Sequence, residues 1–344
     1  MGAGMMDFTK DAPQDDGSQD APEVRRESWS CAGTAELEIA VDVGSVQVEL
    51  TDLPEGESGE VRVEVRHDPD IGGFLAQGVR GVVNWVSGAA ASWTASKGFP
   101  GFGSWDVGSF DTGPLESAGF DIGRLGAEAV RATEISWSEA GRRLVVRSPQ
   151  QMPLRLVPLA VTVHAPADSR LAGHTGAGDL TVTGRSGWTA LRTGTGRVRA
   201  DEVNGDLDVQ TGSGDVTITR TRGRSRVRTG SGTITVEDAA GSLDAKAGSG
   251  DVQIARLAGD LDARTGSGDV RLDVAVSGRA DITAGSGDLT VGVHPGVWAE
   301  VDLSSGSGKA RSDLDVRSTP PEDQPRLHLR GRTGTGDVLV TRAR

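Results

Sequence analysis

The sequence has no tyrosine, a single cysteine and few aromatic residues. The lone Cys31 excludes an intramolecular disulfide and a metal cluster built from cysteines. With aromatic residues at only 4% and glycines numbering 50, a core of large rings is excluded, and many tight turns around small side chains are indicated.

Basic charge is also scarce. The 36 lysines and arginines stand against 49 aspartates and glutamates, a net charge of −13, which argues against nucleic acid or an anionic membrane as an electrostatic partner. The first residues contain no apolar run of the kind found in secretory signals, and RRESWS before Cys31 does not resemble a lipoprotein cleavage site. We therefore expect a cytoplasmic protein in which residues 1–28 form a disordered acidic tail.

A short turn recurs along most of the chain. Gly-x-Gly triplets begin every 18 residues at Gly176, Gly194, Gly212, Gly230, Gly248 and Gly266, and then at Gly285, Gly306 and Gly334. A second glycine series lies halfway between them, so each unit consists of two short strands and two turns. A fixed period of this kind indicates a repeat fold.

Apolar residues alternate within each half-repeat, as in Val216 and Ile218, which is typical of strands with one buried face. Such strands could form consecutive hairpins or stack on the strand 18 residues later. Charges favour stacking, because Glu202, Arg220, Asp238 and Arg256 alternate in sign at 18-residue steps and neighbouring parallel strands would place them about 4.8 Å apart. The predicted fold class is all-β: a single-stranded parallel β-solenoid with about 18 residues per coil, expected to be right-handed.

Four segments follow from this pattern: the tail 1–28, N-terminal solenoid strands in 29–70, a partly helical insertion at 71–132, and the solenoid repeats at 133–344. The insertion is rich in glycine and aromatic residues, and a helix-like run is predicted at 125–132. Residues 132–149 are predicted to form a hairpin. The final strand, 337–344, is expected at the open end of the stack.

The repeated Gly-x-Gly-Asp turn is interpreted as structural, with glycines that permit positive φ and aspartates that accept backbone hydrogen bonds. Its best examples are Gly212, Gly214, Asp215, Gly248, Gly250, Asp251, Gly266, Gly268, Asp269, Gly285, Gly287 and Asp288. A calcium-binding β-roll is a minor alternative. In the β-roll motif the aspartate stands two residues after the last glycine, whereas in this chain it follows the second glycine directly. Phosphate-binding loops are excluded because these turns lead into strands.

One further clue is the segment LAVTVHAPADSRLAGHTGAGDLTVTG at residues 159–184, together with TAELEIAVDVGSVQVEL at 34–50. Both resemble the bacterial putative-adhesin β-strand-repeat family of domains of unknown function, over residues 30–70 and 133–344. The resemblance implies a β-solenoid with a binding or scaffold role, often linked to the cell envelope, and it supplies no catalytic residues.

The sequence therefore predicts a non-enzymatic binding or scaffold protein, without cofactor, metal site or nucleic-acid partner. A protein partner or self-association is expected, and peripheral membrane contact through 71–120 is a weaker interpretation. The candidate interaction surface consists of Trp85, Trp93, Phe99, Phe102 and Trp105. The alternative is a self-assembling structural protein similar to bactofilins, whose solenoid ends stack.

Overall fold

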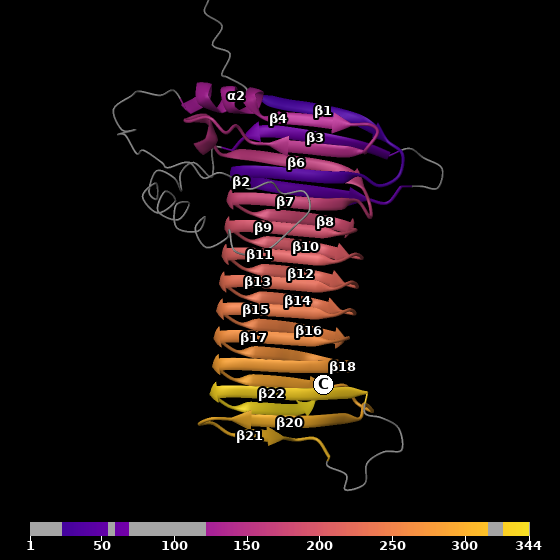
Figure 1. Cartoon of the computed structure of the whole chain (residues 1–344), viewed down its shortest axis with the longest axis vertical. Helices are drawn as coiled ribbons and strands as arrows, with labels where there is room; N and C mark the ends of the chain where they lie inside the picture. Colours follow the sequence, from indigo (N-terminus) through magenta and orange to yellow (C-terminus); the bar gives the residue numbers. More distant parts are fainter. Residues whose placement is uncertain (1–22, 54–58, 69–121, 316–325, 344) are drawn as a thin grey trace, which may run out of the picture.

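The computed structural model describes residues 23–53, 59–68, 122–315 and 326–343. Within these ranges the chain is built almost entirely of strands, stacked as layers of a tall column (Figure 1). The strands form two ladders, sheet A and sheet B, which face each other across a narrow core. The fold is therefore all-β, largely parallel and solenoid-like.

Sheet A contains, in spatial order, β1 (Val24–Cys31), β3 (Gly59–His67), β6 (Leu159–Pro166), the second half of β2 (Glu36–Thr51), β8 (Leu180–Ser186), β10 (Val198–Val203), β12 (Val216–Thr221), β14 (Ile234–Ala239), β16 (Val252–Ala258), the first half of β18 (Val270–Ser286), β19 (Leu289–Val293), β23 (Val338–Arg342) and β21 (Ala310–Ser312).

Sheet B contains, in spatial order, β4 (Glu134–Ser138), β5 (Arg143–Arg147), the first half of β2, β7 (Arg170–Ala177), β9 (Thr189–Thr195), β11 (Leu207–Ser213), β13 (Ser225–Ser231), β15 (Leu243–Ser249), β17 (Leu261–Ser267), the second half of β18, β22 (Leu327–Thr335) and β20 (Ala299–Ser305).

Parallel pairing in the middle of the column joins residues far apart in sequence. Val216 of β12 lies beside Ile234 of β14, and Arg220 beside Asp238, a separation of 18 positions. Because side chains alternate between the two faces of a strand, this register keeps inward-facing residues beside inward-facing residues.

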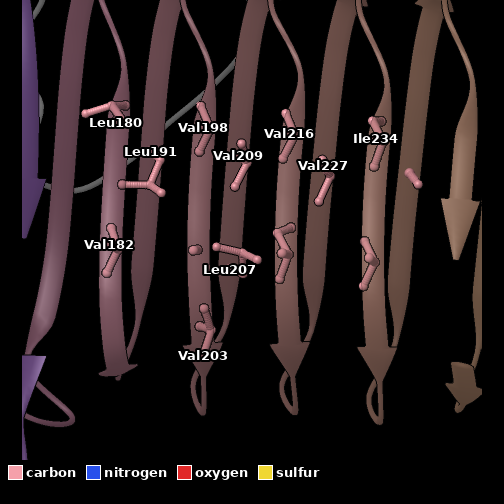
Figure 2. Close-up of a cluster of buried hydrophobic side chains, with 14 of the residues drawn as sticks. Leu180, Val182, Leu191, Val198, Val203, Leu207, Val209, Val216, Val227 and Ile234 are labelled. Carbon is pink, nitrogen blue, oxygen red and sulfur yellow. The ribbon is translucent and has the colours of Figure 1, made fainter. Parts of the chain in front are cut away.

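Apolar side chains from both sheets fill the core (Figure 2). Val198, Val216 and Ile234 line it from sheet A, and Val209 and Val227 from sheet B, each at most 2% exposed. These side chains are aliphatic rather than aromatic, in keeping with the low aromatic content of the sequence.

At the N-terminal end the spatial order differs from the chain order. Strand β2 lies between coils that come more than a hundred residues later: its first half pairs with β5 and β7, and its second half with β6 and β8. It crosses from one sheet to the other at Gly44, whose φ is +130°.

The same end is closed by antiparallel strands and a helix. Strand β1 pairs with β3 in antiparallel register, and β4 with β5. Trp29 of β1 stacks on Trp137 of β4 with ring centroids 5.8 Å apart, and α2 (Ile122–Ala132) contributes the fully buried Ala129 and Val130 to the core. Within 29–70, β2 pairs in parallel with its neighbours, whereas β1 and β3 form an antiparallel pair.

Strand β1 corrects the predicted end of the acidic tail at residue 28. It begins at Val24. Alternate residues of VRRESWSC are less exposed than their neighbours, and every residue from Val24 to Cys31 is paired with a residue of β3. The predicted helix at 125–132 is confirmed by α2, and the predicted hairpin at 132–149 by β4 and β5.

At the C-terminal end the spatial order of the last two coils is the reverse of their order in the chain. The final strands β22 and β23 pair with β18 and β19 on one side and with β20 and β21 on the other. The prediction that the last strand lies at the open end was therefore wrong. Leu327, Leu329, Val338 and Val340 are at most 2% exposed in this position, which is covered on both sides, while β20 and the short β21 form the edge.

No helix in the described ranges has the length and apolar character needed to cross a membrane.

Candidate binding surface

The repeated turns form one corner of the column. In each Gly-x-Gly triplet of the central repeats, the second glycine has positive φ, for example +139° at Gly250 and +136° at Gly268. A Cβ atom on Gly250 would lie 2.1 Å from the carbonyl oxygen of Gly232 in the preceding coil. Glycine is therefore required both by the backbone conformation and by the close approach of stacked turns.

The aspartates that follow these glycines bind backbone N–H groups of the next coil. Oδ1 of Asp215 accepts from the amide of Thr233 at 2.9 Å, and Oδ1 of Asp251 from that of Asp269 at 2.9 Å. Asp269 in turn accepts from Asp288 at 2.8 Å. The partner lies one coil away rather than within the same turn, so each aspartate joins two coils. This geometry favours the structural interpretation of the turn.

Buried threonines complete the corner. The Thr229 hydroxyl donates to the carbonyl oxygen of Gly214 at 3.2 Å, and Thr265 donates to Gly250 at 2.9 Å. These contacts satisfy polar atoms that the sharp corner removes from the regular ladder. Together the glycine, aspartate and threonine explain why the same short motif returns in coil after coil.

The outward face of sheet A carries the charges predicted to alternate. Arg220 lies 3.9 Å from Glu202 and 3.4 Å from Asp238, and Asp238 lies 3.3 Å from Arg256. Each pair bridges neighbouring strands, as expected from the 18-residue steps. Exposed pairs of this kind contribute about 0.2–1 kcal/mol each, so they favour the register more than they stabilise the fold.

The outward face of sheet B has a different arrangement, which the sequence analysis missed. Arg228, Lys246 and Arg264 lie side by side on successive strands; we call them the basic column. Each stands two residues before the first glycine of a triplet, and this constant repeat position is the signal that could have revealed them. Like charges on adjacent parallel strands repel, so this arrangement lowers the stability of the fold, whereas the alternating charges on sheet A do not.

An acidic column runs beside the basic one. Lys246 lies 2.8 Å from Asp244 and Arg264 lies 2.9 Å from Asp262, each pair within one strand. These bonds offset part of the repulsion within both columns. Arg228 has no such neighbour, because Arg226 occupies the equivalent place, and its side chain is exposed. The face therefore presents a narrow line of positive charge on an acidic protein.

Residues 160–337, from β6 through β22, match the family model described as Toastrack DUF4097. The chain belongs to the Toastrack DUF4097 family. The predicted resemblance to bacterial putative-adhesin domains is thereby confirmed. All the corner aspartates and both columns described above lie inside the toastrack region.

Solved structures resemble the chain only distantly. A "putative adhesin" from Bacteroides fragilis is 10% identical, covers 92% of this chain and 97% of its own, and has a TM-score of 0.34. A "putative cell adhesion protein" from Clostridium sporogenes is 10% identical over 94% and 100%, with a TM-score of 0.25. A "putative lipid binding protein" from Parabacteroides distasonis is 9% identical over 95% and 98%, with a TM-score of 0.30. No curated protein matches in sequence.

The five aromatic residues predicted as an interaction surface, Trp85, Trp93, Phe99, Phe102 and Trp105, lie outside the described residues. Trp188, within the toastrack region, lies under the guanidinium of Arg170 at 5.5 Å from the ring centroid. This contact fixes Trp188 against the column.

A buried ion cluster lies outside the toastrack match, where β2 meets β5. Glu38 is 6% exposed and accepts hydrogen bonds from the guanidinium groups of Arg143 and Arg147, the latter at 2.7 Å. Burial alone would raise the pKa of Glu38, but the hydrogen bonds and charges of the two arginines outweigh it and hold the pKa below the ordinary glutamate value. The cluster ties the N-terminal strand β2 to a strand more than a hundred residues later.

This cluster predicts a specific dependence on pH. A carboxyl group whose pKa is lower in the folded than in the unfolded state stabilises the fold above its unfolded pKa, and that stabilisation is lost as the pH falls through the folded value. Glu38→Gln should therefore lower the free energy of unfolding by about 2 kcal/mol at pH 7, and the difference from the unmodified chain should shrink in acid. Urea unfolding at pH 7 and pH 3 measures this.

The matched control is Glu64→Gln, which removes the exposed pair between Glu64 and Arg26 and should have little effect at either pH. If Glu38→Gln lowered the free energy of unfolding by the same amount at pH 7 and at pH 3, the role assigned to the Glu38 charge would be contradicted.

Calcium should have little effect on the corner aspartates. One oxygen of each carboxylate already accepts a backbone amide, as in Asp251 and Asp269, whereas calcium requires six to eight oxygen ligands converging on one point. We expect the thermal midpoint to change by less than about 1 °C between excess calcium and excess chelator. A rise of several degrees in calcium that Asp251→Asn abolished would instead support the β-roll alternative.

Proposed function

We propose that the chain is a non-enzymatic binding or scaffold protein whose column of right-handed, 18-residue coils presents its outer faces and the insertion at 71–120 to a protein partner. The observation that carries the proposal is the outward face of sheet B, where Arg228, Lys246 and Arg264 form a line of like charge on a fully paired sheet. Repulsion within that line costs stability, which supports a role for it in contacting something outside the chain.

The ionisable groups with shifted pKa values support a scaffold rather than an enzyme. Hydrogen bonds from Arg185 lower the pKa of Asp168, and bonds to Asp281 raise the pKa of Arg279. Asp168 and Arg185 form an ion pair between neighbouring segments of the column, and Arg279 and Asp281 form one within β18.

The experiment is cross-linking in native cells with the full chain as bait, followed by quantitative mass spectrometry. One variant combines Arg228→Glu, Lys246→Glu and Arg264→Glu. A second replaces Trp85, Trp93, Phe99, Phe102 and Trp105 by serine. The matched control combines Arg220→Glu and Arg256→Glu on sheet A, where the column alternates in sign.

We expect at least one partner whose recovery falls about tenfold or more in the first or the second variant and is unchanged in the control. Loss in the first variant assigns the contact to sheet B, and loss in the second assigns it to the insertion. Partners recovered equally with all three variants would contradict the proposal.

A further inference from the structure

The C-terminal end of the column ends in two strands that are each paired on one side only. Within the described residues, β20 pairs with β22 alone and β21 with β23 alone. An edge strand presents a row of unpaired N–H and C=O groups that can pair with another strand.

The apolar residues at this end are incompletely covered. Val301 and Leu303 of β20 are half-buried, although the residues beside them in the ladder, Leu329 and Gly331, are buried. Trp298, which precedes β20, is 38% exposed. The described residues thus leave part of the core exposed at this end.

The opposite end of the column is capped, although its outer strands are also paired on one side only, β1 with β3 and β4 with β5. Helix α2 seals the core with Ala129 and Val130, and Trp29 and Trp137 stack across the gap between the sheets. Figure 1 shows α2 and β1 at that end, far from β20 and β21. Trp29 and Trp137 are half-buried, as Val301 and Leu303 are, but only at the N-terminal end does a helix of the described residues lie over the core.

The two open edges carry opposite charges. Strand β20 points Glu300 and Asp302 outward, with side chains 71% and 59% exposed, each 3.0 Å from a side chain of β22, His328 and Arg330. The other edge carries Lys309 and Arg311; the side chain of Arg311 is 67% exposed and lies 3.8 Å from Asp313, which offsets part of its charge. One end of the molecule thus holds an acidic edge in sheet B and a basic edge in sheet A.

These edges are complementary to those of a second copy. Strands β20 and β21 run in opposite directions (Figure 1). A two-fold axis parallel to the strands places the second copy end to end with the first. Strand β21 of the second copy then lies antiparallel to β20 of the first, and β20 of the second copy lies antiparallel to β21 of the first. Each acidic edge then meets a basic edge, and the contact is self-complementary, as a two-fold interface must be.

We propose that two copies of this chain pair head to head through β20 and β21, so that both sheets continue across the interface and the half-buried Val301 and Leu303 become covered. The contact joins two C-terminal ends and leaves outside the ends that α2 and the Trp29–Trp137 pair cap, so we expect the assembly to stop at two copies. The interface uses neither the basic column nor the insertion, so it stands apart from the proposed contact with a protein partner.

The test is sedimentation velocity of the full chain over a range of concentrations. We expect a reversible equilibrium between monomer and dimer, with no larger species. Asp302→Lys alone and Arg311→Glu alone should each raise the dimer dissociation constant about tenfold or more. The double variant should restore it to within about threefold of the unmodified chain, because the charges are exchanged across the interface.

The matched control is Asp281→Lys, which lies in the same outward column as Asp302 but two strands inside the edge, and should leave dimerisation unchanged. Circular dichroism checks that each variant keeps its β-structure. A chain that stays monomeric at every concentration, one that forms filaments, or a double variant that remains as weak as the single ones would overturn the proposal.

Discussion

Replacing Gly214 by alanine is expected to lower the free energy of unfolding by about 3 kcal/mol or more. Gly214 has a φ of +149°, and a Cβ atom there would lie 1.9 Å from the carbonyl oxygen of Gly196 in the coil before it. The new methyl group must push two stacked coils apart, which weakens the hydrogen bonds on both sides of the corner. Urea unfolding followed by far-UV circular dichroism measures the change.

Gly296→Ala is the matched control for this substitution. Gly296 also has positive φ, +84°, but no atom lies within 4 Å of the position of its Cβ. Alanine at this position has an unfavourable φ but no steric clash, and it should lower the free energy of unfolding by about 1–2 kcal/mol. Equal losses at Gly214 and Gly296 would show that the stacked turns do not approach as closely as the structure requires.

Truncating Ile254 to alanine should have an effect of similar size, about 2–5 kcal/mol. Ile254 is 1% exposed in β16, and its ladder neighbours Val236 and Leu272 are also buried. A cavity in this narrow core cannot be filled by movement of one sheet, because strands above and below hold both sheets in place. The smaller change Ile254→Val should cost about 1 kcal/mol.

The control for the core is Gln253→Ala on the neighbouring outward position, where the side chain is exposed and the loss should stay within about 0.5 kcal/mol. If Ile254→Ala and Gln253→Ala were equally mild, the inward face assigned to β16 would be wrong.

Repetition made the central part of this fold predictable from sequence. Because one pattern recurs every 18 residues, the sign alternation of Arg220 and Asp238 could be compared across copies, and it favoured parallel stacking over hairpins. The same repetition identified the corner glycines, such as Gly250, before their positive φ was known. A single copy of the motif would have left both questions open.

The order of the coils at the two ends could not be predicted in this way. Local alternation identifies a strand but not the strand beside it, and 278–293, 299–312 and 327–342 all carry the same alternation. Their order depends on how much apolar surface each coil buries when other coils lie on both sides of it, and this requires comparing segments that are far apart in sequence. In the structure, β22 and β23 lie between two coils, and their apolar residues Leu327, Leu329, Val338 and Val340 are buried.

The candidate binding surface was only partly predictable for a related reason. The role of Asp251 as an acceptor followed from its residue type, but its donor lies one coil away. The cluster around Glu38 joins residues separated by 105 and 109 positions, and no short-range pattern indicates such a pair. The basic column could have been found, since its members share one position in the repeat.

Distances between spin labels on the outward face of sheet A test the central claim most directly. In a chain with Cys31 replaced by alanine, one label is placed at Thr181 and the second at Gln253, Arg271, Leu339 or Arg311, which lie four, five, seven and eight strands away. At about 4.8 Å per strand, the distances should rise through about 19, 24, 34 and 38 Å. Distances that failed to grow with strand number, or an Arg311 label closer to Thr181 than the Leu339 label, would contradict a parallel ladder with its last two coils exchanged.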